Sequence, residues 1–103
     1  MEIIKEGRDN ATIIMGGEVD LSNSHLLKET LNMLYEEGFK VVTLDFSQVT
    51  GIGSAGLGKL LLFQKRFKER GGGLKIINIK SKHIQKMFNM IQLARVIEIE
   101  NSG

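Results

Sequence analysis

The sequence has no cysteine and no tryptophan, and it has only two histidines and one tyrosine among its 103 residues. The missing cysteines exclude a disulfide framework, a cysteine nucleophile and a zinc finger, and the two histidines, His25 and His83, lie far apart in the chain. Surfaces that bind nucleic acid interleave basic residues with stacking aromatic rings, whereas this chain has only one tyrosine and no tryptophan and its basic residues are scattered. We therefore predict a protein without a metal, without another cofactor and without a nucleic-acid partner.

Long apolar runs are also missing. The longest one, residues 60–63, is far shorter than the roughly 20 residues of a membrane-spanning helix, and the first six residues, MEIIKE, lack the pattern of a secretory signal. Hydrophobic residues make up 42% and charged residues 25% of the chain, as in ordinary globular proteins. We expect one domain over residues 1–103, located in the cytoplasm and not inserted in a membrane.

The formal net charge of +2 hides an uneven distribution. Residues 1–50 carry four basic and nine acidic side chains, a balance of −5, whereas residues 51–103 carry ten basic and three acidic ones, a balance of +7. The basic residues are scattered along predicted helices. This pattern favours a solvated surface over a nucleic-acid groove.

The hydrophobic pattern predicts strands that alternate with helices. The expected elements are, in order, a hairpin of strands at 3–4 and 11–15, a helix from about 22 to 38, a strand at 41–46, a helix from 54 to 70, a strand at 74–79, a short helix at 84–91 and an edge strand at 96–99. One face of the second helix is predicted to carry, on it or near it, Leu57, Leu60, Leu61, Gln64 and Phe67. This ββαβαβαβ order predicts an α/β fold with one mixed sheet, parallel wherever a helix makes the crossover.

One glycine motif resembles a nucleotide-binding fingerprint. Residues 51–56 read G-I-G-S-A-G, a G-x-G-x-x-G between a predicted strand and a predicted helix. A dinucleotide site needs these glycines directly after the strand and a carboxylate at the end of the next strand. Here residues 47–51 are expected to intervene, and the next strand ends with Asn78, Ile79 and Lys80. Nucleotide binding through Gly51, Gly53 and Gly56 is therefore a minor alternative.

Ser54 is predicted at the N-cap of the second helix, where two interpretations are open. Its hydroxyl could accept a hydrogen bond from a backbone N–H of the first turn, a contribution of about 1 kcal/mol. Alternatively, the hydroxyl is exposed at the positive end of the helix, which favours a phosphate. Asp20 and Asp45 follow apolar stretches and could lie at the same end of the sheet, but no histidine is placed to complete a nucleophilic triad.

Five short motifs in order resemble the STAS domain of bacterial anti-sigma-factor antagonists. They are the run GGEVD at 16–20, a helix anchored by Leu27, the run VTLDFSQVTGIGSAGLG at 42–58, the pair Gly72-Gly73 before a strand, and IQKMF at 84–88. The resemblance covers nearly the whole chain. It implies a compact single domain with helices chiefly on one face of a mixed sheet, no enzymatic activity, and binding of a serine-kinase anti-sigma factor.

The resemblance also implies a phosphorylation switch at Ser54. The family has Asp immediately before this serine, whereas this chain has Gly53. If the strands before residues 20–23 and 51–54 are parallel neighbours, both loops lie at one edge of the sheet. The predicted partner-binding residues are Asp20, Ser22, Asn23, Gly53, Ser54, Ala55 and Gly56.

Two other functions stay open at this point. The same fold could serve as an accessory subunit of a transport or stress-signalling complex without any phosphorylation, and the departure at Gly53 adds weight to this alternative. The glycine loop could instead bind a nucleotide, as discussed above.

Overall fold

The computed structural model describes residues 1–100 and confirms the predicted order of strands and helices. The elements are β1 (Glu2–Glu6), β2 (Asn10–Val19), α1 (Ser24–Glu36), β3 (Val41–Ile52), α2 (Ser54–Glu69), β4 (Gly73–Ile77), α3 (Lys82–Met90), the 3₁₀ turn η1 (Leu93–Arg95) and β5 (Glu98–Glu100). No helix in the described part of the chain is long and apolar enough to cross a membrane.

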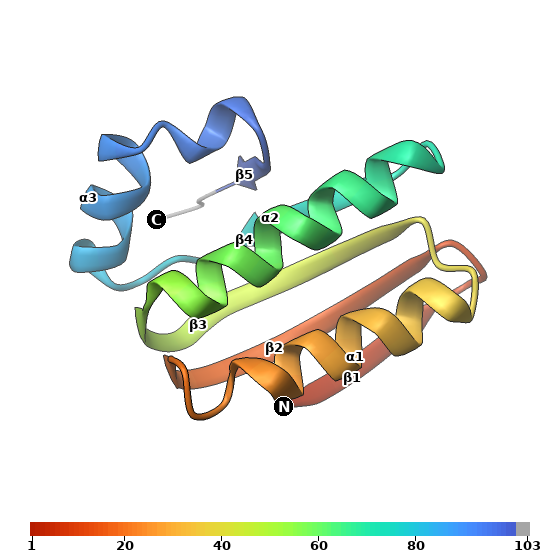
Figure 1. Cartoon of the computed structure of the whole chain (residues 1–103), viewed down its shortest axis with the longest axis horizontal. Coiled ribbons are helices and arrows are strands. Elements are labelled where there is room, and N and C mark those ends of the chain that lie inside the picture. The colour runs from red at the N-terminus through yellow and green to blue at the C-terminus, as the bar shows by residue number, and fades with distance from the viewer. Residues whose placement is uncertain (101–103) are drawn as a thin grey trace.

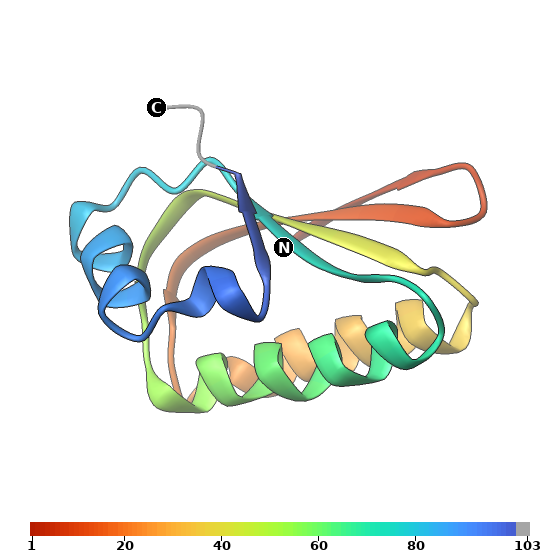
Figure 2. The ribbon, with the colours of Figure 1, turned by 90° about the horizontal axis from the view of Figure 1, so that it is seen from above.

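The five strands form one mixed sheet in the order β1-β2-β3-β4-β5. The hairpin β1–β2 is antiparallel, and each later pair is parallel. Helices α1 and α2 lie side by side on one face of the sheet (Figure 1). None of the helices within residues 1–100 covers the opposite face, and α3 lies at the end where β2 and β3 enter their helices (Figure 2). The predicted mixed sheet, with helices chiefly on one face and β5 at an edge, is confirmed.

The core lies between the sheet and the two long helices. Alternate residues of β3 point into it, and both helices present an apolar stripe to it; fully buried members are Val42, Leu44, Phe46, Leu27, Leu31, Leu34, Leu60, Phe63 and Phe67. Burying one such side chain stabilises the fold by about 1.5–3 kcal/mol. Leu61 was predicted on or near this face of α2, and its side chain is 41% exposed because it lies beside the buried stripe and not in it.

β2 and β3 are both longer than predicted. β2 continues through the glycine pair to Val19, and β3 continues through residues 47–51 to Ile52. The pairing register shifts twice, between Ile14 and Gly16 and again between Gly17 and Glu18. Such irregularities bend a strand without ending it. The polar residues and glycines that predict a turn therefore belong to a bent strand.

The bent part of the sheet has only two strands. β4 pairs with β3 only as far as Asp45, so beyond that point β3 is paired with β2 alone. Figure 2 shows both strands curving toward the helix layer before they enter α1 and α2. Consequently Gly53 follows β3 directly, and the prediction that residues 47–51 lie outside the strand is wrong.

Candidate functional site

The bent strands bring two loops together at one edge. Val19 at the end of β2 pairs with Ile52 at the end of β3, and the Gly53 N–H donates a hydrogen bond of 2.9 Å to the Val19 carbonyl oxygen. We call residues 20–23 and 53–56 the loop edge. The prediction that these two loops share one edge of the sheet is confirmed.

The first turn of α2 is pressed against the ends of both strands. A Cβ atom at Gly56 would lie 2.7 Å from the Val19 Cγ1 atom and 3.1 Å from the Ile52 Cγ1 atom. Real Cβ atoms do not approach carbon this closely, so only glycine fits without a shift of the neighbours. Gly56 is buried, and its close contacts set the distance between the first turn of α2, which includes Ser54, and the ends of the two strands.

Ser54 does not cap α2, contrary to the prediction. The N-cap residue is Gly53, whose backbone is extended at φ −95° and ψ 178°, and no side chain forms a cap hydrogen bond there. Ser54 is the first helical residue and is exposed. The first N–H groups of a helix have no partner within it, and the helix dipole is positive at this end. The hydroxyl of Ser54 thus stands in a position that favours a phosphate group.

The loop before α1 is tied together by its own side chains. The Asn23 Oδ1 atom accepts a hydrogen bond of 2.8 Å from the Asp20 N–H, and its Nδ2 atom donates one of 2.6 Å to the Glu18 carbonyl oxygen. Asn23 occupies the N-cap position but makes no side-chain cap hydrogen bond. Its side chain cannot cap the helix because both ends of its amide bind the preceding chain.

Asp20 is held ionised at the loop edge. Its Oδ1 atom accepts hydrogen bonds from the Ser22 hydroxyl at 2.6 Å and from the Ser22 N–H at 2.9 Å. These two bonds lower the pKa of the Asp20 carboxyl below its usual value. Because the pKa of Asp20 is lower in the folded protein than in the unfolded chain, its hydrogen bonds stabilise the fold at a pH above the unfolded-state pKa. This stabilisation is lost as the pH falls through the folded-state pKa.

Two residues that the sequence reasoning did not assign also lie here. Leu21 projects from the loop with 83% of its surface exposed. His83, in the first turn of α3, helps to line a small groove together with Glu18, Asp20, Gly51 and Gly53. No periodicity or motif signals His83, since its place depends on how α3 packs against the end of the sheet.

Asp45 does not belong to the loop edge. It lies in β3 at the register of Ile14 and Ile77, seven residues before the strand ends. Burial acts to raise the pKa of its carboxyl, but hydrogen bonds from Ser47 and Asn78 outweigh it, so the pKa is lowered overall. The described residues hold no cluster of three or more histidine, aspartate or glutamate side chains that could bind a metal.

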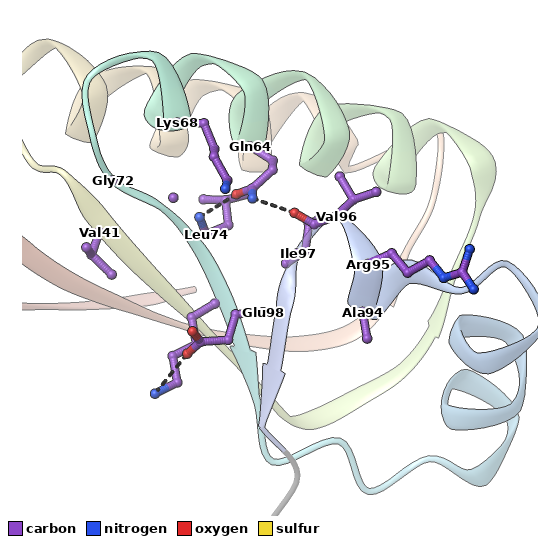
Figure 3. Close-up of a pocket in the computed structure, with 12 residues that line it drawn as sticks. Val41, Gln64, Lys68, Gly72, Leu74, Ala94, Arg95, Val96, Ile97 and Glu98 are labelled. Atoms are coloured by element: carbon purple, nitrogen blue, oxygen red, sulfur yellow. Dashed lines mark hydrogen bonds and ion pairs between the residues drawn. The ribbon is translucent and has the colours of Figure 1, made fainter.

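A cavity of about 450 Å³ lies away from the loop edge, between α2, β4 and η1 (Figure 3). Gln64, which is 4% exposed, spans it: its Oε1 atom accepts from the Leu74 N–H and its Nε2 atom donates to the Val96 carbonyl oxygen, both at 2.6 Å. Ten residues along a helix separate Gln64 from Ser54, about 15 Å. Gln64 therefore joins α2 to the C-terminal part of the sheet and is not part of the candidate site.

Comparisons with known proteins agree with this geometry. An anti-sigma-B factor antagonist of Bacillus subtilis is 28% identical over 96 residues, covering 93% of this chain and 86% of that protein. The crystal structure of TM1081, a candidate anti-sigma factor antagonist from Thermotoga maritima, superposes with a TM-score of 0.84 at 21% identity, covering 96% of this chain and 84% of that chain. SpoIIAA, a Bacillus cell fate determinant, solved in its phosphorylated form, gives a TM-score of 0.77 at 16% identity and covers 99% of this chain and 90% of that chain.

The family profile of the STAS domain matches residues 2–102. That match spans every strand and helix described above, including both loops of the loop edge. The chain belongs to the STAS domain family.

Proposed function

We propose that the chain is an anti-sigma-factor antagonist of the cytoplasm, which binds a serine-kinase anti-sigma factor through the loop edge. The observation that carries the proposal is the exposed Ser54 at the first position of α2, free of any capping role and beside the turn at residues 20–23. The names of the relatives, anti-sigma factor antagonists, support the same partner class. The remaining predicted contacts are Asp20, Ser22, Asn23, Gly53 and Ala55, with Gly56 as the buried support.

Phosphorylation of Ser54 would act as the switch. A phosphoserine adds about −1.5 to −2 charge at pH 7. The N-terminus of α2 stabilises this charge within the domain, because unpaired N–H groups and the helix dipole point toward it. The same charge stands beside the ionised Asp20 and alters the surface that a partner meets. The partner is then released without any refolding of the domain.

The test uses Ser54→Asp and a purified serine-kinase anti-sigma factor of the source organism. The variant should bind at least tenfold more weakly, a loss of about 1.4 kcal/mol, while its thermal unfolding is unchanged or improved. Asn89→Asp, an identical change of charge on the exposed surface of α3, is the matched control and should bind as wild type does. Wild-type affinity in the Ser54→Asp variant would contradict the switch.

The contacts of Gly53 and Gly56 explain both glycines without a bound nucleotide. The Gly53 N–H is already bonded to the Val19 carbonyl oxygen, and the space beside Gly56 is filled by Val19 and Ile52. The segment after β4 also carries no carboxylate, since it reads Asn78, Ile79 and Lys80. These contacts favour partner binding over a nucleotide site. Calorimetric titration with ATP and NAD should give no binding heat if the proposal is correct.

A further inference from the structure

Gly58 is a glycine that the isolated domain does not need. It lies in the second turn of α2 and is exposed, and nothing lies within 4 Å of the point that a Cβ atom would occupy. A glycine inside a helix weakens that helix relative to alanine, because the unfolded chain gains more conformational freedom. Gly56, by contrast, is required by its contacts. The cost at Gly58 thus has no compensation within the described structure.

Two exposed leucines follow Gly58 on the same side of α2. Leu61 and Leu62 are each 41% exposed. Residues three, four, seven and eight positions apart share one face of a helix, so Ser54, Gly58, Leu61, Leu62 and Lys65 form a single stripe. This outer stripe is about 16 Å long and faces away from the buried stripe that contacts the sheet. It begins at the candidate switch residue.

The missing side chain at Gly58, next to the apolar side chains of Leu61 and Leu62, leaves room for a helix of another protein to pack against α2. The distance between the axes of two packed helices is about 8–10 Å and depends on the side chains at the contact. Gly58 allows the closest approach, while Leu61 and Leu62 supply the apolar surface that such a contact buries. A partner lying on the outer stripe would therefore account for both the glycine and the leucines.

The charge of α2 selects the kind of partner. Lys65 belongs to the stripe and α2 has three further cations, Lys59, Arg66 and Lys68, whereas its one carboxylate, Glu69, lies in the last turn. Arg66 lies over the Phe63 ring with its guanidinium 5.1 Å from the ring centroid. A second copy of α2 would bring four cations and only one carboxylate against the same set, and this net repulsion disfavours a symmetric dimer.

We propose that the partner surface extends from Ser54 along the outer stripe of α2, and that it receives an apolar helix of the anti-sigma factor with carboxylates at its margins. This inference rests on the proposed function, since it assigns a second contact to the same partner. It predicts that the stripe supplies affinity while Ser54, at its end, controls that affinity.

The experiment measures the affinity of the full chain for the same purified anti-sigma factor, together with thermal unfolding. Gly58→Ala should bind at least fivefold more weakly although its unfolding temperature rises, and this opposition of signs is not produced by a purely structural role. The double variant Leu61→Ser, Leu62→Ser should bind at least tenfold more weakly. Met33→Ser is the matched control, because Met33 is 39% exposed on α1, and it should bind within twofold of wild type.

Each outcome decides a separate point. If wild type binds and Ser54→Asp binds weakly, but the Gly58 and leucine variants bind as wild type does, the outer stripe is not a contact and the proposed function stands. If wild type binds no serine-kinase anti-sigma factor, both proposals fail. If sedimentation shows that wild type dimerises and the leucine variant does not, the stripe is occupied by a second copy and the inference is wrong.

Discussion

Replacing Gly53 by Asp places a carboxylate directly before Ser54, the proposed switch residue, and the structure indicates that the change is tolerated. The backbone of Gly53 is extended, at φ −95°, so it does not require glycine. The nearest atoms to a Cβ at this position are the Val19 carbonyl oxygen at 3.9 Å and the Asp20 Cα atom at 4.0 Å, which is ordinary contact. The variant should therefore fold with an unchanged loop edge.

The expected gain in stability has three sources. A side-chain cap in place of glycine contributes a few tenths of a kcal/mol, and a negative charge at a helix N-terminus contributes about 0.3–1 kcal/mol. Removal of a glycine from the unfolded chain adds about 0.4–1 kcal/mol. Repulsion from the ionised Asp20 opposes these gains. We expect a net stabilisation of about 1 kcal/mol at pH 7, or roughly 4–8 °C in the unfolding temperature.

Gly53→Asn separates the charge from the cap. Asparagine caps as well as aspartate does but has no charge, so the difference between the two variants reports the carboxylate alone. The N-terminus of α2 lowers the pKa of an aspartate at this position, and its electrostatic contribution is therefore complete above about pH 4 and is lost as the pH falls toward 3. Urea unfolding at pH 7 and pH 3 measures both effects.

Phosphate incorporation gives the functional readout. With a purified serine-kinase anti-sigma factor, Gly53→Asp should be phosphorylated at Ser54 faster than wild type and faster than Gly53→Asn. If the folded Gly53→Asp variant is phosphorylated no faster than Gly53→Asn, the kinase does not recognise a carboxylate at this position. A destabilisation of more than about 0.5 kcal/mol at pH 7 would contradict the open, extended geometry at Gly53.

Three further substitutions test the supports of the site. Asn23→Ala removes both bonds that tie the loop to β2 and should lower the free energy of unfolding by about 1–2 kcal/mol in urea titrations; unchanged stability would show that these bonds contribute nothing. Gly56→Val should cost about 2 kcal/mol or more through its clash with Val19, and a fully stable variant would contradict the close packing of α2. Gln64→Met leaves the buried Leu74 N–H without an acceptor and should cost about 1–3 kcal/mol, with faster hydrogen exchange at that amide as the specific signature.

The sequence predicts the architecture well because hydrophobic period and chain order determine it. Alternation in β3 and the stripe through Leu27, Leu31 and Leu34 require only local information, and parallel crossovers follow from the element order. The ends of β2 and β3 could not be predicted, since Gly17 and Ser47 favour turns by themselves and are held in strands only by pairing between distant segments.

The same limit applies to the candidate site. Ser54 could be singled out from the glycines and the family motif, but its exact helix position depends on where β3 ends. The amide of Asn23 could cap α1 or bind the chain before it, and only the folded loop decides between these. Gly58 and Leu61 could not be assigned to a candidate contact surface from the sequence, because their exposure depends on which side of α2 packs against the sheet.

The order of strands in the sheet also has a consequence for synthesis on the ribosome. Each strand pairs with its neighbour in sequence: Asn10 lies opposite Val41 and Val41 opposite Gly73, about thirty residues apart in each case. No strand must wait for a partner from the far end of the chain. Nascent chains are elongated at about 5–20 residues per second, and their N-terminal segments can fold first. Pairing of β2 with β3 can therefore begin, and α2 with Ser54 can pack on it, before α3 and β5 have emerged from the ribosome.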